Sequence, residues 1–176
     1  MYQTAPLRYA AQMQWLVRTV MAILLVGTFA LWASPDAISL GVARRVLPSG
    51  AAWIDQRAQG MGLLISLLPL TVALLSLWHT DCLFSLYGRG EGLSLAAAGR
   101  LRRIGRGVML LGVLGPPVGS ALSFILTMAA PPGARTVTIG FSSQDLALVV
   151  VGCLLLAIAA MAAQAARLAD DHASIV

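Results

Sequence analysis

Charged residues are scarce in this sequence of 176 residues, at 11%, while 59% of the residues are hydrophobic. Soluble domains usually carry about 25% charged residues, and a soluble domain of this size could not cover so much apolar surface. The composition therefore argues against an ordinary soluble domain and predicts an integral membrane protein. The length fits one domain, which we place at residues 1–176.

Lysine is absent, and cysteine is rare. All twelve basic residues are arginine, which is typical of a GC-rich bacterial genome, and the net charge is +5. In a membrane protein we expect such an excess of positive charge to set the topology and to contact anionic membrane lipid. We expect no direct binding of nucleic acid. The two cysteines, Cys82 and Cys153, form no CxxC pair, which argues against a disulfide framework or a structural zinc site.

Ionisable residues are almost missing from the long apolar runs. Arg18 is the exception, and we expect it to reach the cytoplasmic edge of the membrane. Transporters commonly place ionisable groups inside the membrane, so a small transporter is the most distant function that we consider. The sequence also has no Ser–His–Asp order, no HExxH and no phosphate-binding glycine loop. We therefore expect a protein that is not an enzyme and that uses no cofactor or metal.

Four long apolar runs are present, and each is long enough to cross a bilayer as a helix. They predict an all-α fold, an integral membrane bundle of four transmembrane helices at about residues 13–33, 60–87, 107–130 and 146–168. Trp15 and Trp32 bracket the first run, and we expect them at the two membrane interfaces.

The segments between and within these runs carry further signals. ISLGVARRVL, residues 38–47, is expected to form a short interfacial helix. GPPVG at 115–119 predicts a bend or break in the third helix. TVTIGF at 136–141 favours a short extended piece, and Ser142 with Asp145 fits a capping box that opens the fourth helix.

Arginine distribution orients the predicted helices. One side collects eight arginines: Arg8, Arg18, Arg89, Arg100, Arg102, Arg103, Arg106 and Arg167. The other side collects four: Arg44, Arg45, Arg57 and Arg135. Because positive charge accumulates on the cytoplasmic side, the pattern predicts a multi-pass protein of the bacterial inner membrane with both termini in the cytoplasm.

The stretch LFSLYGRGEGLSLAAAGRLRRIG at residues 83–105 concentrates charge between two apolar runs. On a helix over residues 93–108, an apolar stripe faces one side, and arginines face the other. This predicts a short interfacial helix between the second and third transmembrane helices. The stripe is Leu93, Ala97, Leu101, Ile104 and Val108, and the opposite side carries Arg102, Arg103 and Arg106.

Two readings of these arginines stay open. They anchor the helix at anionic headgroups, or they dock an acidic partner; binding of nucleic acid ranks third. Glu91, the only acid in the stretch, is expected to pair with Arg89 or Arg100. We take the candidate partner or lipid contacts to be Arg89, Glu91, Arg100, Arg102, Arg103 and Arg106.

Two further patterns have modest weight. His79, Asp81 and His172 could approach one another at the cytoplasmic edge, but a polar helix end explains them more simply than a metal site. The small residues of the fourth run, Gly152, Ala159, Ala163 and Ala166, lie along one stripe, which predicts close packing on a neighbouring helix of the same chain.

The stretch also resembles a family of bacterial four-helix integral membrane proteins known only as a domain of unknown function. The residues that carry the resemblance are Leu83, Phe84, Tyr87, Gly90, Glu91, Leu101, Arg102, Arg103, Ile104 and Gly105. The resemblance covers about residues 60–176. Gly92 and Leu93 depart from it, because the family has an aromatic residue and an acidic helix start after Gly-Glu.

The family has no established enzymatic activity, and its genes often lie beside that of a small Cro-type helix-turn-helix regulator, so the resemblance implies a membrane protein that binds a cytoplasmic one. We therefore expect a membrane regulator or sensor that binds a cytoplasmic protein through the 79–106 loop and the C-terminal tail. The alternative is an accessory structural subunit of a larger membrane protein complex, which would contact the other subunits of that complex.

Overall fold

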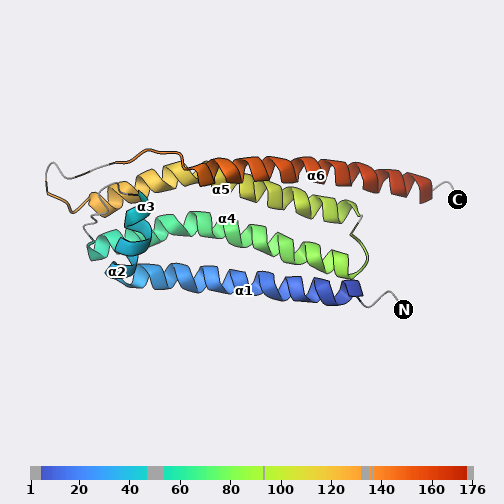
Figure 1. Cartoon of the computed structure of the whole chain (residues 1–176), viewed down its shortest axis with the longest axis horizontal. Helices are drawn as coiled ribbons and strands as arrows, with labels where there is room; N and C mark the ends of the chain where they lie inside the picture. The colour runs from blue at the N-terminus through green and yellow to red at the C-terminus, as the bar shows by residue number, and fades with distance from the viewer. Residues whose placement is uncertain (1–4, 47–53, 93, 132–134, 136, 174–176) are drawn as a thin grey trace.

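A computed structural model describes residues 5–46, 54–92, 94–131, 135 and 137–173, with the backbone alone for residues 5–9, 46 and 170–173. Within these residues the fold is all-helical (Figure 1). Each of four helices contains a stretch long and apolar enough to cross a membrane, which confirms the predicted set, and each begins earlier than predicted. They are α1 (Ala5–Ala33), α4 (Gln56–Gly88), α5 (Leu95–Thr127) and α6 (Ser143–Ala173).

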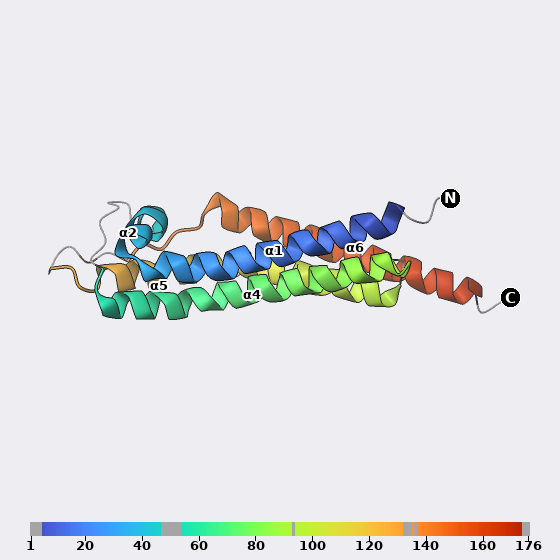
Figure 2. The ribbon, with the colours of Figure 1, turned by 90° about the horizontal axis from the view of Figure 1, so that it is seen from below.

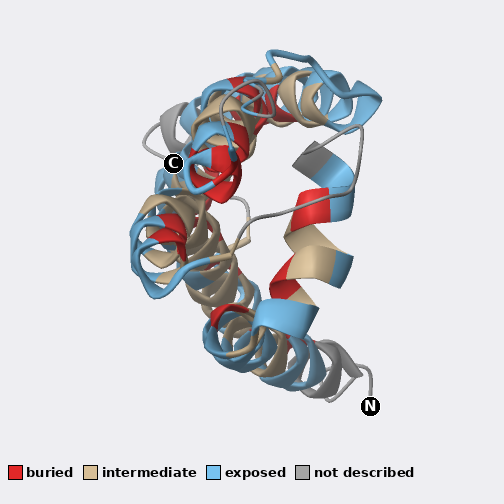
Figure 3. Cartoon of the chain, turned by 90° about the vertical axis from the view of Figure 1, so that its left-hand side faces the viewer, coloured by how far each residue is buried: buried red, intermediate tan, exposed pale blue. Residues whose placement is uncertain are grey.

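The four helices form a row rather than a closed ring. α1 packs against α4, α4 against α5 and α5 against α6. Seen along the helices, the row curves into an open arc with α1 and α6 at its ends (Figure 3). Within the described residues no comparable contact joins α1 to α6. The predicted bundle is therefore open along one side.

Three short helical pieces span the open side at one end of the arc (Figure 3). They are α2 (Pro35–Ile38), the π-helical turn η1 (Ser39–Ala43) and α3 (Arg44–Val46), and α3 reaches α5. The short helix predicted at 38–47 is thus confirmed over its described part. Ser34 begins the run, because its hydroxyl accepts a hydrogen bond from the amide of Ala37 at 3.4 Å.

This end also holds the largest buried cluster, which comprises Trp32, Ile38, Ala43, Leu122 and Leu126. Trp32 is only 5% exposed, and a Cβ atom at Gly62 would overlap its indole ring. Trp15, in contrast, is 73% exposed. The ring of Trp32 therefore fills the space that a glycine on α4 leaves, and the placement of both tryptophans at the membrane interfaces stays a prediction.

α5 corrects two predictions. Residues 95–106 are helical as expected, but they continue directly into 107–127, so the described residues contain no separate interfacial helix between α4 and α5. Pro116 and Pro117 do not break the helix either, while the bend expected at this point stays a prediction. The hydroxyl of Ser120 donates to the carbonyl of Pro116 at 2.8 Å, which adds a local hydrogen bond at this point.

The connection into α6 is irregular, and residues 137–142 contain no strand. Its residue Thr138 donates its amide to the buried Ser123 hydroxyl at 3.0 Å, which fastens the connection to α5. The predicted capping box is confirmed. The amide of Asp145 donates to the Ser142 hydroxyl at 3.1 Å, and the amide of Ser142 donates to the Asp145 carboxylate at 3.0 Å.

Glycine allows α5 and α6 to approach closely. A Cβ atom at Gly112 would lie 2.5 Å from the carbonyl oxygen of Asp145, and one at Gly152 would lie 2.6 Å from the amide nitrogen of Met109. Ala159 and Ala166 of α6 are buried as well. The prediction that the small residues of the fourth run pack on a neighbouring helix is confirmed, and that helix is α5.

The same contacts set the axial position of α6. Asp145, at the start of α6, lies against Gly112 and Gly115, near the middle of α5. α6 therefore begins halfway along α5 and extends past its first residue (Figures 1 and 2). As a result, the apolar residues 156–163 of α6 run beside the arginine-bearing first turns of α5.

Candidate functional site

The predicted site residues gather at one end of the molecule, which we call the arginine end. It comprises Arg89, Arg100, Arg102, Arg103 and Arg106. The start of α1, the end of α6 and the connection between α4 and α5 all lie at this end, while α2 and α3 lie at the other (Figures 1 and 2).

A tight turn places these arginines. Gly90 follows α4 with φ +79°, a conformation that glycine adopts readily. The amide of Glu91 then donates to the carbonyl of Leu86 at 3.0 Å, the pattern of a Schellman C-cap. Ser94 caps α5 by accepting from the amide of Ala97 at 3.2 Å. α5 therefore starts directly after α4 ends, and it presents its arginines within the first three turns.

The described apolar stripe faces inward, as predicted. Ala97 is buried, and Leu101, Ile104 and Val108 are half-buried. Leu93, the first residue of that stripe, lies outside the described residues. The opposite side of the helix is exposed at Arg102, Arg103 and Arg106, as expected for an amphipathic segment.

The prediction that Glu91 pairs with a neighbouring arginine is wrong, as judged from the side chains that the structure describes. Glu91 is exposed and makes no ion pair with Arg89 or Arg100. Arg100 turns to α4 instead, where its Nη1 atom lies 3.2 Å from Nδ1 of His79. The His79 ring in turn stacks on Trp78, with ring centroids 5.4 Å apart. These contacts tie the first turns of α5 to α4.

Sequence reasoning missed an ion pair that ties α1 to α4. Arg18 donates from Nε and Nη2 to the two carboxylate oxygens of Asp81, at 3.2 and 3.1 Å. The Asp81 side chain is 16% exposed, while that of Arg18 is 66% exposed. Gln14 adds a hydrogen bond to the carbonyl of Asp81 at 3.3 Å. The only indication of this pair in the sequence is that one basic and one acidic residue occur in two separate apolar runs.

Among the described side chains, no group of three histidine, cysteine, aspartate or glutamate residues gathers as a metal site would require. Asp81 is bound by Arg18, and His79 faces Arg100. The side chain of His172 lies outside the described part, so its predicted approach to the other two is not described.

The arginines divide between two faces of α5. On the α4 side, a cleft of about 300 Å³ lies between α1, α4 and α5, and its lining includes Arg18, Asp81, Arg89 and Arg100. Arg103 and Arg100 line a smaller hollow next to it. A separate groove lies on the α6 side of α5.

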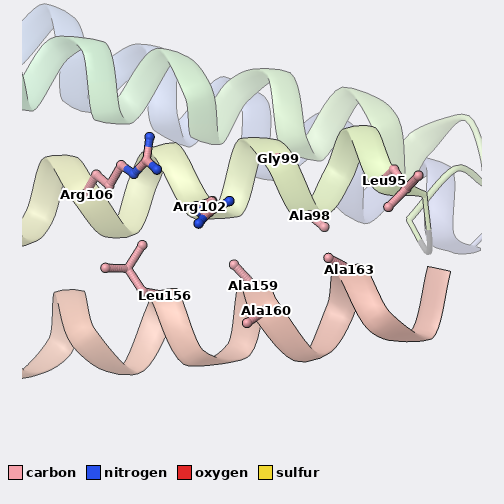
Figure 4. A pocket seen from close by; sticks show the side chains of 9 residues that line it. All are labelled: Leu95, Ala98, Gly99, Arg102, Arg106, Leu156, Ala159, Ala160 and Ala163. Atoms are coloured by element: carbon pink, nitrogen blue, oxygen red, sulfur yellow. The ribbon is translucent and has the colours of Figure 1, made fainter. Parts of the chain in front are cut away.

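We call this second feature the alanine groove, a cavity of about 460 Å³ between α5 and α6 (Figure 4). Its lining is Leu95, Ala98, Gly99, Arg102 and Arg106 from α5, and Leu156, Ala159, Ala160 and Ala163 from α6. Neither arginine in it has a hydrogen bond or ion pair with another described side chain. The α6 wall of the groove is wholly apolar, whereas the α5 wall is basic.

Comparisons of the chain with protein-family models, with curated proteins and with solved structures give no match. The functional argument therefore rests on the arrangement of the arginine end itself.

Proposed function

We propose that this chain is a non-enzymatic regulator or sensor of the bacterial inner membrane that binds an acidic segment of a cytoplasmic protein. The binding surface is the α4 side of the arginine end, together with the end of α6. The single observation that carries the proposal is an excess of positive charge without a local counter-charge. Arg89 and Arg103 are exposed, and neither has a carboxylate partner among the described side chains.

The setting of these charges supports a docking surface. The carboxylate of Asp81 is occupied by Arg18, so it does not neutralise Arg89 or Arg100 in the shared cleft. Glu91 is exposed and forms no ion pair among the described residues. Unpaired arginines favour association with carboxylate-rich surfaces, because guanidinium groups bind carboxylates in a bidentate manner.

Charge distribution supports the cytoplasmic location of this end. The arginine end, with the adjoining termini, collects eight arginines against four on the other side. Positive charge near membrane-spanning segments stays in the cytoplasm during insertion. A partner at this end is therefore a cytoplasmic protein or a cytoplasmic domain.

The test removes the charge, and the thermal unfolding temperature of the variant shows whether loss of the contact between Arg100 and His79 also loosens the fold. We expect a triple variant, Arg89→Gln, Arg100→Gln and Arg103→Gln, to insert normally and to lose at least tenfold of its affinity for a purified partner. The matched control is the triple variant Arg44→Gln, Arg45→Gln and Arg57→Gln at the opposite end, which removes equal charge. Candidate partners come from affinity purification in mild detergent, and binding is then measured with purified components at two salt concentrations. Equal loss in both triple variants would contradict the proposal.

An accessory subunit of a larger membrane complex is the second candidate, and the open arc favours it. Within the described residues, α1 and α6 each pack extensively against one other long helix, so both ends of the row leave apolar helix faces available. A subunit would co-purify with its complex in fixed ratio and would be degraded when expressed alone. A regulator would accumulate alone and would bind its partner reversibly.

A further inference from the structure

We infer that the alanine groove is a binding site for an anionic phospholipid, with the lipid phosphate between Arg102 and Arg106. The groove lies on the α6 side of α5, whereas the arginines of the proposed docking surface lie on the α4 side, and the inference does not depend on that proposal. It depends only on the four helices lying in a membrane.

The walls of the groove fix the chemistry of its occupant. Arg102 and Arg106 lie one helical turn apart on α5, exposed, and without a partner among the described side chains. The α6 wall of the groove carries Ala159, Ala160 and Ala163, which offer no polar side-chain atom (Figure 4). A ligand that satisfies both walls must have an anionic part and an apolar part.

The axial offset of α6 creates this combination. Because α6 begins beside the middle of α5, its apolar residues 156–163 accompany the basic first turns of α5. At the boundary between headgroups and acyl chains, a phospholipid contacts basic side chains and apolar side chains together, as a hydrophobic helix segment next to arginines provides. Basic pockets between transmembrane helices bind lipid headgroups in the same manner.

The small side chains provide the room. Gly99 and the three alanines leave the groove open, and a Cβ atom at Gly99 would meet nothing within 4 Å. The volume of about 460 Å³ falls within the range of small-molecule sites and accommodates a phosphate with the first part of an acyl chain. An acidic peptide would satisfy the arginines but would leave its polar backbone against the alanine wall, which disfavours it.

The experiment uses the full chain in nanodiscs of phosphatidylcholine with and without phosphatidylglycerol, and native mass spectrometry counts the phosphatidylglycerol that stays bound. We expect retention of phosphatidylglycerol by the wild type and retention at least tenfold weaker in the double variant Arg102→Gln and Arg106→Gln. The control double variant, Arg89→Gln and Arg103→Gln, removes equal charge at the same end and should retain the lipid. Equal loss in both double variants would overturn the inference, because general surface charge would then explain the binding.

A second variant tests the apolar wall. Ala160→Leu fills the groove without changing charge, and we expect it to reduce phosphatidylglycerol retention while the thermal unfolding temperature stays within a few degrees of the wild type. Undiminished retention in this variant would place the lipid elsewhere.

Competition experiments identify the source of the anion. Inorganic phosphate or a polyglutamate peptide should fail to displace the lipid at equal concentration. Displacement by either one would assign the groove to a soluble anion or to a protein instead.

Discussion

At the residue scale, the side chains that matter most are charged groups placed where apolar sequence surrounds them. Asp81 is the clearest example, because its carboxylate is mostly buried and is held by both Nε and Nη2 of Arg18. A bidentate arginine–carboxylate pair is stronger and more directional than a single contact. The pair therefore fixes the position of α1 against α4 as well as neutralising two charges.

Removal of either partner should loosen α1. We expect Arg18→Ala or Asp81→Ala to lower the free energy of unfolding by about 1 kcal/mol, and the charge-reversed pair Arg18→Asp with Asp81→Arg to recover part of it. Unfolding in detergent by increasing SDS, analysed as a double-mutant cycle, measures the coupling. Arg57→Ala, an exposed arginine without an ion pair, serves as the control. Strict additivity of the two single changes would contradict a coupled pair.

At the element scale, glycine positions determine how far α6 is displaced along α5. Gly112 and Gly152 bring backbone against backbone, and neither neighbour can move aside as a flexible side chain would. Close approach through small residues is a general device of helix packing in membranes. The offset of α6, and with it the alanine groove, therefore depends on a few glycines.

A substitution at Gly112 should separate α5 from α6. We expect Gly112→Val to destabilise the fold by at least about 2 kcal/mol, because the new side chain meets the carbonyl of Asp145 and the amide of Val149. Gly119→Val is the matched control on the same helix, where a Cβ atom meets nothing within 4 Å. Its effect should stay within about 0.5 kcal/mol after allowance for helix propensity, as measured by SDS unfolding. Similar effects of both changes would show that the contact at Gly112 is unimportant.

At the scale of the whole molecule, sequence and structure agree on the long helices, which are the feature that hydropathy can predict. Long apolar runs predicted the four helices, and local hydrogen-bonding chemistry predicted the capping box of Ser142 and Asp145. Hydropathy carries no information on how helices pack, so it missed the open arc, the axial offset of α6 and the burial of Trp32 against Gly62.

The candidate site was predicted in part for the same reason. Helical periodicity placed Arg102, Arg103 and Arg106 on one exposed side of α5. It could not show that Arg102 and Arg106 line the groove with α6 while the charge of Arg103 lies near His79 of α4, because that division depends on neighbouring helices. Nor could local spacing show that Arg100 turns to His79 rather than to Glu91, since His79 lies on a different helix.

Both the docking proposal and the predicted topology require the arginine end to face the cytoplasm. The most direct test is single-cysteine labelling in intact cells, in a background with Cys82→Ser and Cys153→Ser. The reporters are Glu91→Cys in the exposed turn of the arginine end and Arg135→Cys, which is exposed at the other end. A membrane-impermeant maleimide should label Arg135→Cys in intact cells and should reach Glu91→Cys only after the inner membrane is opened. Labelling of Glu91→Cys in intact cells would contradict the account.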